Sequence, residues 1–162
     1  MNIDKELYRM IFKRKSFHLF QDIDNCSITA NDIQDIEETY KKFVPLNSNI
    51  KTDIRIVAAN ETTCRRGEQF CVLLYSEKKD NYLQNIGYLG EQLDLYLVSK
   101  NIGTLWFGMG KTESASFGDH DFVIMIAISK INALFKISAD LTPEYQILYS
   151  RNDIHHYHIG KR

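Results

Sequence analysis

A run of cationic side chains near the N-terminus has the clearest potential for chemistry. It reads Lys13-Arg14-Lys15-Ser16-Phe17-His18. An arginine fork, a lysine ammonium and a serine hydroxyl all donate hydrogen bonds, as a phosphate site requires. The same run also suits a solvated basic helix end, because cations are stabilised near the negative end of the helix dipole. Taken alone, the run favours this second, structural interpretation.

A second candidate is the glycine-containing stretch over 103–112, Gly103-Thr104-Leu105-Trp106-Phe107-Gly108-Met109-Gly110-Lys111-Thr112. Glycines around an aromatic pair allow the backbone to approach a flat ligand closely. The alternative is an ordinary connection between a helix and a strand, with a core tryptophan. A P-loop is excluded because its first glycine would fall on Leu105. A dinucleotide fingerprint is excluded because its third glycine would fall on Glu113.

Metal-binding and nucleophilic residues form no recognisable pattern. The chain has three cysteines: Cys26, Cys64 and Cys71. An odd number without C-x-x-C spacing predicts reduced thiols in a cytoplasmic protein and no zinc site. The polar tail has three histidines: His155, His156 and His158. No acid or cysteine stands at ligand spacing from them, so the sequence predicts no metal site and no catalytic side chain.

The elements that would position these candidates follow from hydrophobic periodicity. Helices are expected over 3–13, from Thr29 onward and over 82–100. The helix that begins at Thr29 is indicated by the capping-box spacing of Thr29 and Asp32. Strands are expected over 53–59, 69–75 and 121–128, with a short apolar segment at 104–107. The 121–128 strand is apolar on both faces, which predicts a central place in a sheet. Thr142-Pro143 could begin a further helix.

Composition and charge limit the class of protein. The 162 residues, 44% of them hydrophobic, predict a single domain over 1–162 with its core at about 3–130 and no clear role for 131–162. A net charge of −1 argues against a dedicated nucleic-acid binder. No stretch of about 18 apolar residues or signal peptide is present, so no membrane association is expected and the predicted location is cytoplasmic.

Three motifs in one order resemble the FMN-dependent nitroreductase family. Arg14 to His18 resembles its R-R-S-x-R signature. The segment 102–108 after the long helix resembles L-G-x-G-T-C-W-x-G, and 122–130 resembles V-x-M-I-A-I-G-K. The resemblance covers about 8–130 and is closest to a divergent branch with two lobes in one chain, of which this chain would be a shortened member.

The resemblance implies an α+β sandwich, in which helices flank a central, mostly antiparallel sheet and FMN usually binds at a dimer interface. Four residues would contact the phosphate and ribityl chain of FMN: Arg14, Lys15, Ser16 and His18. Four would lie along its isoalloxazine ring: Trp106, Phe107, Gly108 and Met109. The implied function is electron transfer from NAD(P)H through FMN to a small oxidised acceptor. No catalytic side chain is required, because the flavin carries the chemistry.

The chain departs from the family pattern in several places. His18 stands where the family has Arg or Lys, and Ser129 replaces a glycine. The A-P-S-x-x-N-x-Q-P segment of the family is missing, and residues 45–49 resemble it only weakly. Lys136 is the one candidate for the family's basic segment that closes over the phosphate. A homodimer would supply the missing wall of the pocket. The alternative is a non-catalytic dimerisation or ligand-binding module that has lost flavin.

Overall fold

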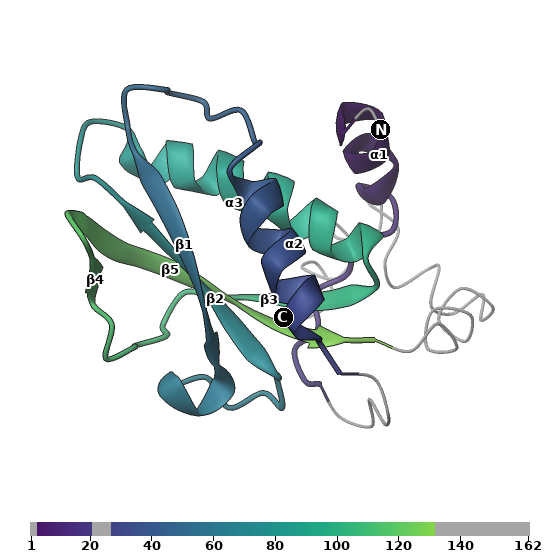
Figure 1. The fold of residues 1–162 in the computed structure, drawn as a ribbon. Coiled ribbons are helices and arrows are strands. Elements are labelled where there is room, and N and C mark those ends of the chain that lie inside the picture. Colours follow the sequence, from purple (N-terminus) through teal and green to yellow (C-terminus); the bar gives the residue numbers. More distant parts are fainter. Residues whose placement is uncertain (1–2, 21–26, 132–162) are drawn as a thin grey trace, which may run out of the picture. The chain divides into compact units, whose positions relative to one another are not determined.

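The fold was obtained as a computed structural model, which describes residues 3–20 and 27–131 (Figure 1). Three α-helices and five strands occur in this part of the chain. In chain order they are α1 (Ile3–Met10), α2 (Ala30–Tyr40), β1 (Thr52–Ala58), β2 (Phe70–Ser76), α3 (Tyr82–Ser99), β3 (Ile102–Phe107), β4 (Ser116–Phe117) and β5 (His120–Lys130), with a 3-10 turn at Ala59–Glu61 after β1. The α+β class is therefore confirmed.

The helix boundaries follow local signals in the sequence. Helix α2 begins after Thr29, whose hydroxyl accepts from the Asp32 backbone N–H at 3.2 Å while the Asp32 carboxylate accepts from the Thr29 N–H at 2.9 Å. This reciprocal pair is the expected capping box. Helix α3 ends just before Asn101, which takes a left-handed φ of 58°. Because the chain turns so tightly there, β3 starts at once, two residues earlier than the apolar segment expected at 104–107.

The strands form one sheet in the order β1-β2-β5-β3, and β4 pairs with the start of β5. All of these pairings are antiparallel. Strand β5 lies between β2 and β3, so its predicted central position is confirmed. Cys71 faces Ala127 across the β2–β5 pair, and Leu105 faces the same Ala127 across the β3–β5 pair.

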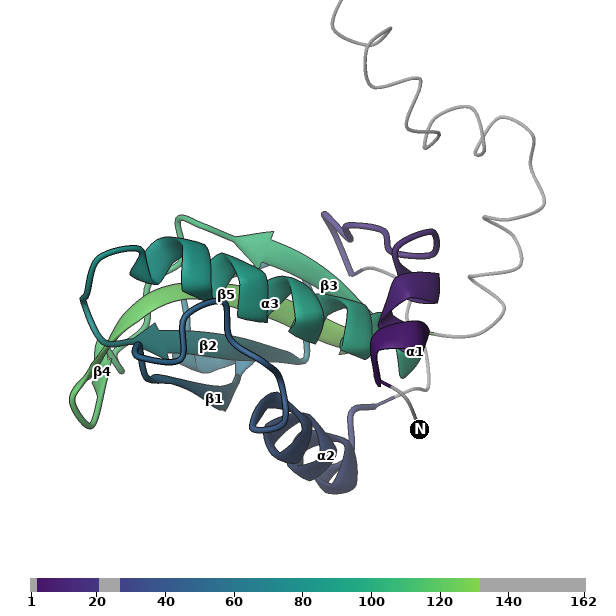
Figure 2. The same ribbon diagram turned by 90° about the horizontal axis from the view of Figure 1, so that it is seen from above.

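Alternation along the strands divides the core into two layers. Figure 2 shows α3 running across the sheet. Helices α1, α2 and α3 cover one face, which we call the helical face. There they pack on strand residues that include Val72, Leu74, Ile102, Ile126 and Ile128. The opposite face carries a second cluster: Phe20, Val57, Cys64, Cys71, Leu73, Tyr75, Leu105, Met125 and Ala127. No residue of the three helices belongs to this second cluster among the described residues.

The segment after α1 extends the sheet beyond β3. Ser16 forms a parallel bridge with Thr104, and the Phe17 N–H donates to the Thr104 carbonyl at 2.9 Å. The Phe20 N–H then donates to the Arg66 carbonyl at 2.7 Å. The predicted phosphate-binding run is therefore fastened along the outer edge of β3.

Several expectations concern residues outside the described ranges. They are Cys26, Lys136, the helix start at Thr142-Pro143, and the tail with His155, His156 and His158. The elements above all lie within residues 3–131. Within the described residues, no helix has both the length and the apolar character needed to cross a membrane.

Candidate functional site

A buried carboxylate on α3 joins the two parts of the site that the sequence predicted. Asp94 has no exposed surface, and its Oδ2 accepts from Arg14 Nε at 2.8 Å and from Trp106 Nε1 at 2.8 Å. Arg14 Nη2 lies 2.7 Å from the same oxygen. The other oxygen, Oδ1, accepts a short hydrogen bond of 2.5 Å from the Thr104 hydroxyl. Arg14 and Trp106, which are distant in sequence, therefore meet at one side chain.

The fold explains why these groups converge. Thr104 and Trp106 alternate along β3, so both side chains point to the helical face, where α3 runs over the sheet. Gly90 lies one helical turn before Asp94 and leaves room for the indole, because a Cβ there would lie 2.3 Å from Trp106 Cη2. The Arg14 N–H donates to the Met10 carbonyl at 2.9 Å, which directs the chain at the end of α1.

The positive charge of Arg14 is paired within the protein. The Arg14 side chain is 29% exposed and pairs with a carboxylate that is fully buried, so its charge is largely compensated within the protein. The pKa of Glu91 is raised, mainly by burial and also by the nearby negative charge of Asp94. The positive charge of Arg14 opposes part of this rise. Arg14 therefore brings little uncompensated positive charge to an anionic ligand.

The donor set nevertheless fits a phosphate. Arg14 uses Nε and Nη2 on Asp94, and among the described residues no acceptor engages its Nη1. Ser16 and Lys15 are half-buried beside it. A guanidinium that is already held in place by a carboxylate loses little conformational freedom when it binds an anion. His18 is exposed at the outer end of this segment.

The four residues expected along the flavin ring do not share one surface. Trp106 belongs to the helical face, whereas Phe107 packs on the opposite face, as adjacent strand residues must. Gly108 and Met109 lie in the exposed turn that follows, and Met109 is 86% exposed. The structure thus brings together Arg14, Ser16 and Trp106 but separates the side chains of Trp106 and Phe107.

Asp94 is the residue that sequence reasoning missed. A signal for it was present, because Asp94 stands within the apolar stripe of α3 beside Leu93 and Leu97, both fully buried. An acid in such a stripe is rarely fully buried without a partner. Its partners could not be named from the sequence, because Arg14 is 80 residues away along the chain.

Comparison with known proteins identifies the family. The family model described as "Putative TM nitroreductase" matches residues 6–154, most of the chain. The chain belongs to this nitroreductase family. No curated protein matches the sequence.

Solved nitroreductase structures share the fold at low sequence identity. A Desulfitobacterium hafniense nitroreductase with bound FMN has a TM-score of 0.60 and 14% identity, over 82% of this chain and 91% of its own. A nitroreductase family protein from Clostridium novyi has a TM-score of 0.55 and 16% identity, over 81% and 88%. A "putative nitroreductase" from Thermotoga maritima has a TM-score of 0.52 and 16% identity, over 79% of this chain but only 49% of its own. The nitroreductase fold is therefore shown.

Proposed function

We propose that this nitroreductase-family chain binds FMN and acts as an oxidoreductase, passing electrons from NAD(P)H through FMN to a small oxidised acceptor. Family membership supports the proposal, as do fold relatives whose structures contain FMN. The observation that carries it is the meeting of Arg14 and Trp106 at Asp94. It places the donor-rich run and the β3 segment side by side, as one ligand site would require.

In this proposal the chain's own residues bind and orient the cofactor. Arg14 Nη1, the Ser16 hydroxyl and the ammonium of Lys15 donate to the phosphate. Asp94 is a positioning residue, because it holds the Arg14 guanidinium and the Trp106 indole at fixed places without being exposed. FMN, when bound, supplies the redox chemistry, so the protein needs no acid–base pair of its own.

We also propose a homodimer that completes the pocket. The segment 13–18 and β3 provide one wall, and a two-fold axis would bring a second copy of the same surface opposite. Tyr8 on α1 and Phe12 just after it support an interface nearby, because they pack edge to face at a centroid distance of 5.7 Å yet remain 64% and 75% exposed. The molar mass in solution, measured by light scattering during size-exclusion chromatography, tests this directly.

The second candidate function is a non-catalytic relative that has lost flavin and serves in dimerisation or ligand binding. Two observations favour it. The charge of Arg14 is already compensated by Asp94, and Trp106 and Phe107 lie on opposite faces of the sheet. Under this alternative the Asp94 network is only structural, and removing Arg14 would change stability but not the affinity for FMN.

Arg14→Ala separates the two candidates. A charged hydrogen bond contributes about 1.5–3 kcal/mol, so the variant should bind FMN about 10- to 150-fold more weakly in a fluorescence titration. Arg9→Ala is the matched control, because Arg9 is an exposed arginine in the last turn of α1. Thermal unfolding without FMN shows whether each variant is folded. Equal FMN affinity in Arg14→Ala, Arg9→Ala and the unsubstituted chain would reject this phosphate site.

A further inference from the structure

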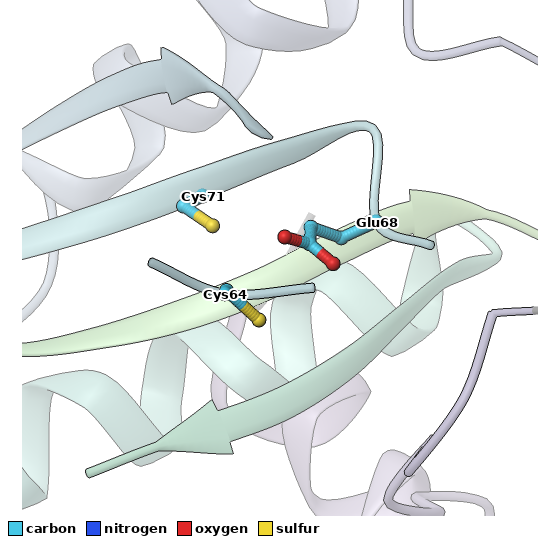
Figure 3. A group of neighbouring side chains, drawn as sticks. All are labelled: Cys64, Glu68 and Cys71. Carbon is cyan, nitrogen blue, oxygen red and sulfur yellow. The ribbon is translucent and has the colours of Figure 1, made fainter. Parts of the chain in front are cut away.

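Two thiols and a carboxylate meet on the sheet face opposite the helices (Figure 3). Cys64 comes from the loop after β1, Glu68 from the turn before β2, and Cys71 from β2 itself. The two sulfurs and a Glu68 carboxylate oxygen all lie within 4.8 Å of one another. Both cysteines are fully buried and Glu68 is only 7% exposed. Figure 3 shows the Cys71 sulfur pointing toward the Glu68 carboxylate.

The Glu68 carboxylate is only partly satisfied within this cluster. Its Oε2 accepts from the Arg66 backbone N–H at 2.7 Å. Its Oε1 is buried and has no hydrogen-bond partner among the described residues. A buried acid oxygen without a donor or a cation is unfavourable, and such groups are normally paired or bound to a metal. The buried Glu68 oxygen therefore points to a cationic ligand in this cluster.

We propose that Cys64, Glu68 and Cys71 bind a thiophilic divalent cation, with Zn²⁺ as the metal that this ligand set suits best. Zinc takes thiolate at about 2.3 Å and carboxylate at about 2.0–2.2 Å, which places ligand atoms of a tetrahedron about 3.5–4 Å apart. The observed cluster is within about 1 Å of that size. Binding replaces two thiol protons, which are released to solvent, and involves no change of oxidation state.

A cavity lies beside two of the three proposed ligands, Cys64 and Glu68. A space of about 280 Å³ is lined by Ala59, Asn60, Cys64, Arg65, Gly67 and Glu68. Three protein ligands with one open position, which a water molecule fills, form a recurrent zinc arrangement. Two thiolates and a carboxylate with Zn²⁺ carry a net charge of −1, and Arg65 at the cavity wall offsets it.

The loop that holds Cys64 is fixed by several hydrogen bonds. The Thr62 hydroxyl accepts from the Cys64 N–H at 3.2 Å and lies 3.5 Å from Cys71 Sγ, so it can donate to a thiolate there. Thr63 and Lys111 exchange two further bonds, at 2.9 and 2.8 Å. Arg65 Nη1 donates to the Thr62 carbonyl at 2.6 Å. Ligands that are held in place before binding lower the entropic cost of taking the metal.

This site was not visible in the sequence, because Cys64 and Cys71 are seven positions apart and lack the C-x-x-C spacing that was sought. The turn before β2 brings the two cysteines together. The inference is independent of flavin binding, since the cluster lies on the sheet face opposite Trp106 and Asp94. Its test therefore needs no flavin.

The test uses the full chain, treated with a chelator, desalted and then given Zn²⁺ alone. One zinc per chain should remain after a second desalting, and the unfolding temperature should rise with zinc concentration. Co²⁺ in place of Zn²⁺ should give a thiolate-to-metal charge-transfer absorption. Cys64→Ser and Cys71→Ser should lose both the retained zinc and this absorption. Cys26→Ser is the matched control and should retain them.

Glu68→Gln tests the site even if a cysteine variant unfolds, because this substitution preserves the shape of the side chain and removes only its charge. It should lose stoichiometric zinc while its unfolding temperature without metal stays close to that of the unsubstituted chain. The proposal is overturned if the unsubstituted chain retains no zinc, or if Cys26→Ser loses as much as Cys64→Ser. Equal zinc retention in all the variants would overturn it as well.

Discussion

Replacing Asp94 with asparagine perturbs the network at the centre of the candidate site while changing almost no volume. Asp94 is completely buried and receives hydrogen bonds from Arg14, Thr104 and Trp106. In Asp94→Asn, the amide oxygen can still accept from Arg14 and Trp106. The amide nitrogen then faces the Thr104 hydroxyl, which can rotate to accept. The substitution therefore removes the negative charge and leaves the pattern of contacts in place.

The expected cost follows from the loss of that charge. A hydrogen bond to a charged group contributes about 1.5–3 kcal/mol, and a neutral one about 1 kcal/mol. The Arg14 head is partly hydrated, since its side chain is 29% exposed, so water recovers some of the loss. We expect Asp94→Asn to lower the free energy of unfolding by about 2 kcal/mol. Asp94→Ala leaves Thr104 and Trp106 without an acceptor and should cost about 3–5 kcal/mol.

Urea denaturation at pH 7, followed by circular dichroism, measures both losses as shifts of the midpoint at constant slope. Asp53→Asn is the matched control, because the Asp53 side chain is 49% exposed and its Oδ2 lies 3.0 Å from His120 Nδ1. That variant should stay within about 0.5 kcal/mol of the unsubstituted chain. If Asp94→Asn were as stable as Asp53→Asn, the account of Asp94 as the buried centre of this site would be refuted.

Two further predictions concern the helices. Gly90→Ala would force a Cβ to 2.3 Å from Trp106 and should destabilise the protein by about 1–3 kcal/mol. Gly87→Ala, on the same helix but with open space around it, should stabilise the protein by about 0.5–1 kcal/mol. Equal effects of the two substitutions in thermal unfolding would contradict the packing described. Burial alone would raise the pKa of Asp32, but the bond from Lys130 and the helix cap outweigh it and lower the pKa to about 2. The stability that the ionised Asp32 contributes is therefore present above about pH 4 and lost as the pH falls toward 2. The difference in free energy of unfolding between the unsubstituted chain and Asp32→Asn should shrink over that range. A difference that does not depend on pH would argue against the pair of Asp32 and Lys130.

Much of the fold could be predicted because its signals are local. The capping pair of Thr29 and Asp32 lies within four residues, so the start of α2 was evident. The central place of β5 followed from the apolar residues on both of its faces. The order of the strands and the parallel bridge of Ser16 with Thr104 depend on contacts between distant segments, which periodicity does not encode.

The candidate site was predicted in part for the same reason. Arg14, Ser16 and Trp106 were selected from short motifs, and the fold brings them together. Asp94 was missed because its role arises only when α3 is laid over β3. Phe107 was expected beside Trp106 on one ligand, but the segment continues as a strand, and strand geometry sends adjacent side chains to opposite faces. Their roles toward FMN remain predictions.

The most direct test of the proposed function is the absorption spectrum of the purified full chain, before and after incubation with FMN and desalting. The account predicts a yellow protein that retains FMN, with the flavin absorbance at about 450 nm, and loss of this retention in Arg14→Ala. A folded protein that stays colourless and retains no added FMN would contradict the central claim and leave the non-catalytic alternative.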